Sequence, residues 1–385
     1  MAADPSRPDH YGPPPDYDTT LLNGHVRTAG RWPLRYVGVA AVGVVLLAVA
    51  LGIGLFGGGG ARPAGLGGSA GTTGAGSSGP GTPGATSAAA TGTPTAGAQA
   101  SATPSPTKAK TTTKPPPPSS GGRPGPGNTG VPAGTRLRVL QGDQEFSVDN
   151  QVISGIDAHG IVRITGRNIT IKNSIFRGGG PPCSRNAAVL ETEDGFGATI
   201  MDSEINPTNP HACLDGIWAE NATLLRLNIH GAVDGVKAFD NVVLQDSWIH
   251  DLGWFASDPN QGGGATHNDC VQTYEGSKNI LIRHNTMDAG PKGNATYQVT
   301  QDFGKVATNL RIENNFLDGG ACILNFAHKG GPTPMTGIYV VNNRFGRHSF
   351  YQCPILVSTQ TQLSQNSGNV WDDTGKPIPP PERHD

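Results

Sequence analysis

A short pattern of apolar and polar positions recurs along the second half of the chain. Each of the seven full copies ends on an apolar residue, with a small polar residue two positions earlier in nearly every copy. Period-two alternation with intervening Asn, Ser and Gly is typical of short β-strands. The copies are ITIKNSIF (169–176), ATIMDSEI (198–205), TLLRLNI (223–229), VVLQDSWI (242–249), ILIRHNTM (280–287), LRIENNFL (310–317), IYVVNNRF (338–345) and a degenerate TQLSQNSG (361–368).

The spacing of these copies predicts a solenoid of parallel strands. Successive copies lie 20–30 residues apart, except for one gap of 38 between Ser247 and Asn285. In a solenoid, like residues of successive coils stack, so apolar residues fill the interior and Asn side chains hydrogen-bond along the stack. The polar column comprises Ser174, Ser203, Ser247, Asn285, Asn315 and Asn343, with Leu227 as the exception.

A second repeat lies between successive copies of the first, so each coil is expected to contribute one strand of each kind. The clear copies are LDGIWA (214–219), VDGVKA (233–238) and NDCVQT (268–273). Alternation within this repeat assigns its faces. The predicted inward column is Ile217, Val236, Val271, Val299 and Ile323. The predicted outward row is Leu190, Trp218, Lys237, Gln272, Thr300 and Leu324.

An aspartate column, Asp215, Asp234 and Asp269, occupies the second position of the three clear copies. Rungs stack at ~4.8 Å, so ionised carboxylates would repel unless a cation or hydrogen bonds compensate. Ca²⁺ suits such a cluster because it accepts six to eight oxygen ligands. Strict alternation, however, directs these aspartates inward. We therefore hold open that they cap backbone N–H groups at turns instead.

On the basis of these two repeats, and of the Asp-Gly and Asp-Cys pairs in the second one, residues 136–372 resemble the right-handed parallel β-helix, pectate-lyase-like superfamily. The resemblance implies an all-β, right-handed, single-stranded parallel β-helix, and the repeats indicate about eight coils. It also implies that the outer face of one sheet forms a substrate groove. The superfamily includes polysaccharide lyases, glycoside hydrolases, epimerases, esterases, phage tailspikes and members without an established activity.

The leading functional hypothesis is β-elimination at a uronate of an extracellular acidic polysaccharide. This chemistry needs a base and a cation that neutralises the substrate carboxylate. Lys237 is the expected base, with His267 as the alternative, and Asp215, Asp234 and Asp269 are the expected Ca²⁺ ligands. Trp218 and Gln272 are expected to contact substrate, and the insertion at 251–266 adds Trp254 as a groove wall.

Two other functions remain open. A glycoside hydrolase would use two of the aspartates, although the N-T-D, D-D and G-H-G signatures of polygalacturonases are absent from the repeats. A non-catalytic, carbohydrate-binding or adhesive β-helix would use the outer face for binding alone.

Histidines and cysteines add structural expectations. His230 and His250 occupy equivalent positions and are expected to stack at a turn, while His284 is expected to be structural. Adjacent coils bring Cys183 to Cys213 and Cys322 to Cys353, so an extracellular chain would form these two disulfides. Cys270 is then the odd cysteine.

The N-terminal part of the chain predicts a tethered protein. Residues 36–56 form an uncharged apolar run long enough to span a bilayer, and Arg27, Arg31 and Arg35 precede it. A retained anchor is favoured over a cleaved signal peptide. We expect a cytoplasmic, disordered segment at 1–35, a disordered Gly/Ser/Thr/Pro linker at 57–135 and a C-terminal tail at 373–385. The formal net charge of −2 argues against nucleic-acid binding. We expect a monomer.

Overall fold

The computed structural model describes residues 122–180, 183, 186–192, 194–274, 276–300, 306–326 and 335–384. The predicted segments 1–35 and 36–56 and most of the predicted linker lie outside these residues. Within the described ranges, no helix is long and apolar enough to cross a membrane. The anchor therefore stays a prediction.

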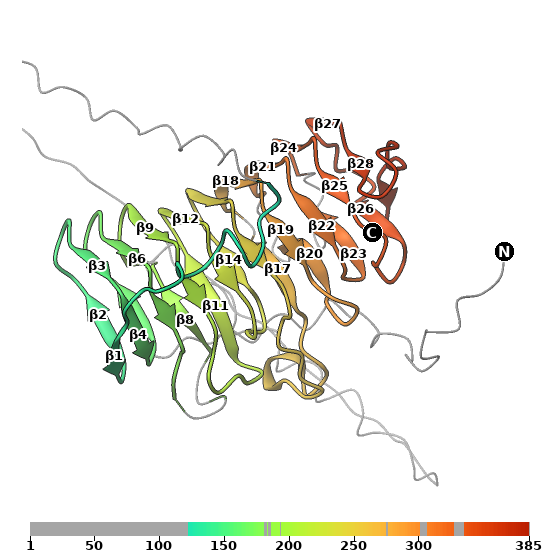
Figure 1. Ribbon diagram of the computed structural model, residues 1–385. Helices are drawn as coiled ribbons and strands as arrows, with labels where there is room; N and C mark the ends of the chain where they lie inside the picture. Colours follow the sequence, from blue (N-terminus) through green and yellow to red (C-terminus); the bar gives the residue numbers. More distant parts are fainter. Residues whose placement is uncertain are drawn as a thin grey trace, which may run out of the picture. The chain divides into compact units, whose positions relative to one another are not determined.

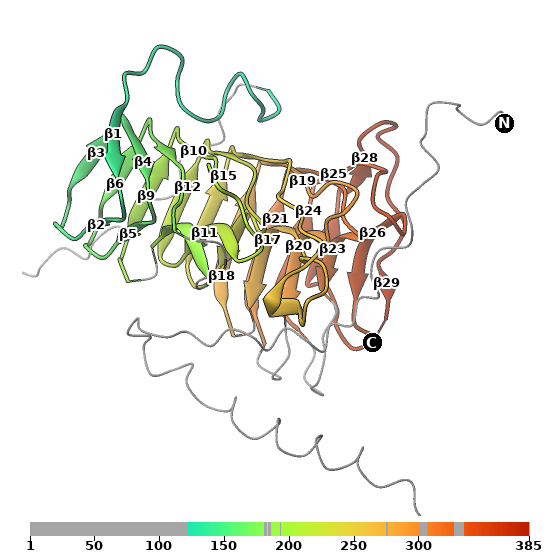
Figure 2. The same cartoon turned by 90° about the horizontal axis from the view of Figure 1, so that it is seen from below.

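Three parallel sheets run side by side along the length of the domain (Figures 1 and 2). Sheet A consists of β1 (Arg138–Gln141), β4 (Ile156–His159), β7 (Ile175–Phe176), β10 (Glu204–Ile205), β13 (Asn228–Ile229), β16 (Trp248–Ile249), β19 (Thr286–Asp288), β22 (Phe316–Asp318), β25 (Arg344–Phe345) and β28 (Val370–Trp371). Sheet B consists of β2 (Gln144–Phe146), β5 (Val162–Ile164), β8 (Ala187–Glu191), β11 (Leu214–Ala219), β14 (Val236–Ala238), β17 (Asp269–Tyr274), β20 (Ala295–Thr300), β23 (Cys322–Phe326), β26 (Cys353–Val357) and β29 (Glu382–Arg383). Sheet C consists of β3 (Val152–Ser154), β6 (Thr170–Lys172), β9 (Ala198–Met201), β12 (Ala222–Leu225), β15 (Val242–Gln245), β18 (Lys278–Arg283), β21 (Thr308–Glu313), β24 (Ile338–Val341) and β27 (Gln365–Ser367).

This topology is that of a parallel β-helix in which each coil contributes a strand to each sheet. The prediction of two strands per coil was wrong, because one copy of the first repeat contains two strands. ITIKNSIF, for example, forms β6, turns at Asn173 with φ of 52°, and continues as β7 in another sheet. Sheets A and B each hold ten strands in the described residues, so the prediction of about eight coils was too low.

The polar column lies at this turn and forms the predicted ladder. The Asn285 backbone N–H donates to Asn315 Oδ1 at 2.9 Å, and the Asn315 N–H donates to Asn343 Oδ1 at 2.9 Å. The ladder continues to Asn369, which accepts from the Asn343 N–H at 2.9 Å. These side chains are buried, so the bonds satisfy polar groups that would otherwise be costly to bury.

The strand pairing in sheet B confirms the three central residues of the predicted outward row and corrects the residues on either side of them. Trp218, Lys237 and Gln272 pair in register on successive strands. Gln298, not Thr300, is next in the outward row, because β20 is displaced by two residues from the expected alignment. A displacement of two residues preserves alternation, so the pattern of apolar positions could not detect it.

Leu190 and Leu324 belong to the interior rather than to the outward row. Leu190 pairs with Ile217, and Leu324 pairs with Tyr297. Both leucines are fully buried in the apolar core. Each follows another buried apolar residue, so the alternation that assigned the faces was ambiguous at these two strands.

Two segments that were predicted to lie outside the domain are part of it. Residues 122–137, a segment that we call the strap, run back along sheet A before β1 (Figure 1). The Arg123 guanidinium pairs with Asp372 at 3.0 Å, and the Gly130 N–H donates to the Arg226 carbonyl at 2.9 Å. At the other end, β29 pairs with β26, so the predicted tail supplies a strand.

Candidate functional site

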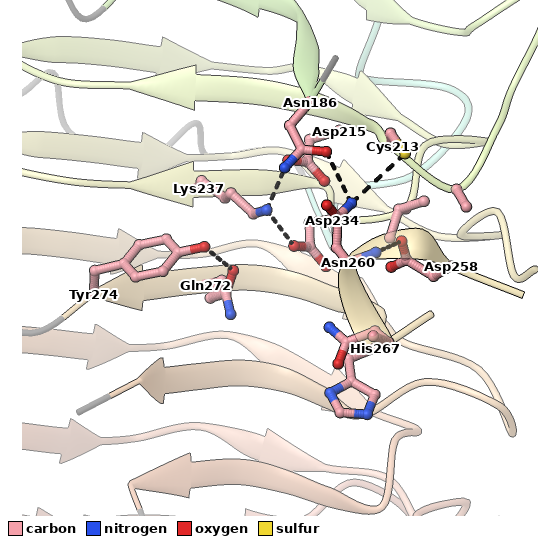
Figure 3. Close-up of a pocket in the computed structure, with 13 residues that line it drawn as sticks. Asn186, Cys213, Asp215, Asp234, Lys237, Asp258, Asn260, His267, Gln272 and Tyr274 are labelled. Carbon is pink, nitrogen blue, oxygen red and sulfur yellow. Dashed lines mark hydrogen bonds and ion pairs between the residues drawn. The ribbon is translucent and has the colours of Figure 1, made fainter. Parts of the chain in front are cut away.

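A pocket lies beside the N-terminal ends of β11, β14 and β17, on the outer side of sheet B (Figure 3). About 430 Å³ of space lies among its lining residues, and part of that space is open solvent. The residues that line it are Asn186, Ala212, Cys213, Asp215, Val233, Asp234, Lys237, Asp258, Asn260, Gln261, His267, Gln272 and Tyr274. The pocket thus brings together Lys237, His267, Gln272 and two of the three predicted aspartates.

Lys237 lies at the centre of the charged groups. Its Nζ is 2.7 Å from Asp215 Oδ2 and 3.2 Å from Asp234 Oδ2, and its side chain is 8 % exposed. Burial acts to lower the pKa of Lys237, but the facing carboxylates outweigh it and raise this pKa well above its ordinary value. A lysine that stays protonated cannot accept a proton. The predicted role of Lys237 as a base does not fit this charge state.

The Asp215 and Asp234 side chains lie on the side of Lys237, not in the apolar interior. The chain bends through residues 231–235 before β14, so strict alternation does not apply to Asp234. At Gly235, a Cβ atom would lie 2.6 Å from the Cys270 carbonyl oxygen, so the bend requires glycine. Asp234 Oδ1 accepts the Asp269 backbone N–H at 2.9 Å. The structure therefore combines a bend with the hydrogen-bond capping that was considered as the alternative to metal binding.

Asp215 and Asp234 are in different environments. Asp215 Oδ2 accepts from Trp218 Nε1 at 2.7 Å as well as from Lys237. Burial raises the pKa of Asp234 to about 7, although Lys237 acts against this shift. Asp234 can therefore carry a proton near neutral pH.

Asp269 is farther inside and does not complete a metal site. It is fully buried, and its Oδ1 accepts from Asn294 Nδ2 at 2.9 Å. Its Oδ2 has no hydrogen-bond partner within the described part of the chain. Burial, and then the neighbouring Asp234, raise the pKa of Asp269 well above its usual range, so the neutral form is favoured.

The geometry gives no support to the calcium site. In the described residues, the single group of three His, Cys, Asp or Glu ligand atoms that all lie within 4.8 Å of one another is Cys183, His211 and Cys213. The three aspartates do not form such a group. Lys237 already supplies positive charge between Asp215 and Asp234. Calcium binding stays a prediction.

Gln272, a predicted substrate contact, is hydrogen-bonded to two other side chains of sheet B. Gln272 Nε2 donates to Thr300 Oγ1 at 3.1 Å, and Gln272 Oε1 accepts from the Tyr274 hydroxyl at 2.9 Å. Tyr274 was missed by sequence reasoning, although its position two residues after Gln272 places it on the same face. Burial raises the pKa of Tyr274 to about 12, and Lys237 acts against this shift.

His267 and the insertion form other parts of the pocket. Burial lowers the pKa of His267, which favours the neutral ring near neutral pH. Trp254 does not line the pocket, and its ring lies 4.0 Å from Lys292 Nζ. The insertion contributes instead through Asp258 and a short 3-10 helix, η2 (Pro259–Gln261), for which Asp258 is the N-cap. The insertion thus lines the pocket through Asp258, Asn260 and Gln261 and not through Trp254.

The remaining histidines and cysteines are arranged largely as predicted. The rings of His230 and His250 stack with centroids 5.1 Å apart, and His284 Nδ1 pairs with Asp246 at 2.6 Å outside the pocket. Both predicted disulfides are confirmed: Cys183 is bonded to Cys213, and Cys322 is bonded to Cys353. Cys270 is a free, buried cysteine.

Comparison of the chain with protein families, curated proteins and solved structures finds no match. The pocket itself is therefore the basis for a functional proposal.

Proposed function

We propose that the protein hydrolyses glycosidic bonds of a neutral carbohydrate through Asp215 and Asp234. The observation that carries the proposal is that both carboxylates bond to the same Lys237 nitrogen, at 2.7 and 3.2 Å. The oxygens that contact this nitrogen therefore lie closer together than the ~6.5 Å at which inverting carboxylate pairs begin, so the pair is compatible with the retaining arrangement and not with the inverting one. The proposal includes membership of the right-handed, pectate-lyase-like superfamily and a cell-surface location.

The two carboxyl groups divide the roles. Asp234, which can hold a proton near neutral pH, protonates the leaving oxygen of the glycosidic bond. Asp215, which is bonded to Lys237 and Trp218, attacks the anomeric carbon and forms a glycosyl-enzyme ester. Asp234 then takes a proton from the water molecule that hydrolyses this ester. Two displacements at one carbon retain the anomeric configuration.

A second candidate, β-elimination at a uronate, is favoured by a different observation. Neutral His267 and cationic Lys237 line the same pocket, and they could supply the base and the neutralising charge. Three carboxyl groups, however, line the pocket beside one ammonium group. An anionic uronate would be repelled there unless a bound cation such as Ca²⁺ compensated, so we place hydrolysis first.

The test is a screen of the full chain on neutral and acidic polysaccharides, with and without Ca²⁺ or EDTA. Hydrolysis predicts new reducing ends without ultraviolet absorbance from an unsaturated product, and a first product of retained configuration by NMR. Elimination predicts absorbance together with the reducing ends. Binding without either product would favour the non-catalytic, adhesive function.

Variants then assign the residues. Asp215→Asn and Asp234→Asn should each lower the rate by at least ~10²-fold, the lower range for loss of a general acid. Asp246→Asn is the matched control, because Asp246 is a buried, paired carboxylate outside the pocket. Equal activity of all three variants would exclude the proposed roles.

A further inference from the structure

Both ends of the insertion at 251–266 are fixed to the solenoid. The Gly253 N–H donates to a carbonyl group of the preceding coil at 2.8 Å, and the Gly253 carbonyl accepts from Asn268 Nδ2, directly before β17, at 2.8 Å. The two arms of the insertion are joined to each other by the Thr266 N–H, which donates to the Phe255 carbonyl at 3.0 Å. The insertion therefore has a firm base.

The tip of the insertion, residues 258–264, is a compact unit with its own hydrogen bonds. The Asp258 N–H donates to the Gly264 carbonyl at 2.7 Å, and the Gly263 N–H donates to the Asp258 carbonyl at 2.9 Å. Asp258 Oδ1 also accepts the Asn260 N–H at 2.8 Å, at the start of η2. The tip can therefore move without losing the bonds that define its shape.

One side chain holds the tip against the solenoid. Asn260 Nδ2 donates to Asn186 Oδ1 at 2.8 Å, across 74 positions of sequence, and to Cys213 Sγ at 3.6 Å (Figure 3). In the described part of the chain, no other group of the tip forms a hydrogen bond or ion pair outside it. The residues that connect the tip to the base, 256–257 and 265, form none there either. The Asn260–Asn186 bond is therefore the main polar contact that keeps the tip in place.

The tip lines the pocket that contains the two proposed catalytic carboxyl groups. Asp258, Asn260 and Gln261 contribute this part of the lining. Asp215 and Asp234 are only 6 % and 4 % exposed. A nucleophile reacts with a carbon atom that lies about 3–3.5 Å away, so a sugar ring must contact Asp215 directly. Carboxyl groups that are buried to this degree cannot make such contact until a wall of the pocket moves.

We propose that the tip is a gate, closed by the Asn260–Asn186 bond, which opens to admit a carbohydrate chain to Asp215 and Asp234. The purpose of the gate rests on the proposed hydrolysis. A neutral hydrogen bond contributes little net free energy, so a gate that is held by one such bond opens readily. Loops that move over an active site in this way commonly control the entry of substrate and the release of product.

Access to the two carboxyl groups can be measured without any substrate. Carbodiimide and glycine ethyl ester are added to the full chain, and mass spectrometry gives the rate of modification at each site. Asn260→Ala should raise the rate at Asp215 and Asp234 by about 2- to 10-fold, the factor expected for one neutral hydrogen bond. Asn186→Ala should act in the same direction. The double variant should differ little from Asn260→Ala, because both substitutions remove the same bond.

Two controls separate opening of the gate from loosening of the domain. Asn186→Asp retains an oxygen acceptor for Asn260, so its modification rate should stay below that of Asn186→Ala. Asp246 is a buried carboxylate outside the pocket, and its modification should not change in any variant. Equal rates at Asp215 and Asp234 in the wild type and Asn260→Ala would overturn the proposal, and so would a parallel rise at Asp246.

Hydrolysis supplies a second measurement, whose failure is distinguishable from that of the gate. If a carbohydrate is cleaved, kcat/KM of Asn260→Ala on a long chain should rise with the modification rate, because substrate is admitted more often. An unchanged kcat/KM would show that the tip does not control entry, and it would overturn the gate. If modification rises and no carbohydrate is cleaved, the proposed function fails while the gate itself stands.

Discussion

Lys237 on β14 and Asp215 on the preceding coil form a 2.7 Å ion pair in which both side chains are 8 % exposed. The pair joins two rungs of sheet B outside the apolar interior. Asp234 adds a second carboxylate to the same ammonium group at 3.2 Å. Removing Lys237 would therefore leave two buried carboxyl groups without their cation.

This burial predicts a large difference between two lysine variants. Lys237→Met should lower the free energy of unfolding by about 3–5 kcal/mol, because it leaves buried carboxylates without their cation. Lys278→Met should cost at most ~1 kcal/mol, because Lys278 pairs with Asp240 but is 50 % exposed. Urea unfolding of both variants measures the difference. Similar costs would show that the Lys237 pair is solvated in solution.

The pKa of Asp234 predicts the alkaline limb of activity. As the acid, Asp234 must be protonated, so kcat/KM should fall by about tenfold per pH unit as the pH rises above about 7. Asp258, another pocket carboxyl group with a raised pKa, supplies the control. The limb should persist in Asp258→Asn, and its disappearance there would assign the acid role to Asp258.

The same shift predicts a pH dependence of stability. Because the pKa of Asp234 is raised from 3.8 to about 7 on folding, the folded state binds the proton more tightly. The stability contributed by proton binding to Asp234 is fully present below pH 3.8 and is lost as the pH rises to about 7. The stability of the protein relative to Asp234→Asn should decline across this window in urea titrations at several pH values. A constant difference would contradict the shift.

The internal ladder should be sensitive to shortening of one Asn. Asn315 donates to the Ile282 carbonyl and to Asn343, each at 2.9 Å, and accepts from the Asn285 N–H. Asn315→Ala should cost about 1–3 kcal/mol for each buried group left without a partner. Asn315→Ser should cost less, since serine serves the same column at Ser247 through an oxygen that accepts the Leu227 N–H at 3.0 Å. Equal unfolding free energies for the two variants would argue against the ladder.

Cys270 should not react with alkylating agents in the folded protein. Burial, followed by nearby carboxylates, raises the pKa of its thiol well above the ordinary value. Iodoacetamide should therefore modify this thiol only after unfolding, as mass spectrometry would show. Rapid modification of the native chain would reopen a nucleophilic role.

Much of this architecture could be predicted from the sequence, because a solenoid repeats its local chemistry along the chain. The apolar columns, the Ser/Asn ladder and both disulfides follow from one alignment of neighbouring coils. The alignment could not fix register where Tyr297 and Val299 share a parity, since a displacement of two residues keeps every side chain on its face. Nor could it show the corner inside each repeat, which depends on a left-handed residue such as Asn173.

Some features of the candidate site could likewise be predicted from the sequence, and others could not. The sequence alone placed Trp218, Lys237 and Gln272 in one row and Asp215 and Asp234 beside it, because these relationships depend on strand periodicity. Only the tertiary structure decided which charges meet. The bend before β14 moves Asp234 toward Lys237, and the insertion adds Asp258 and Asn260 to the pocket. Charge state depends on burial and on partners that are distant in sequence, so the sequence could not show that two carboxyl groups face the buried Lys237 and raise its pKa.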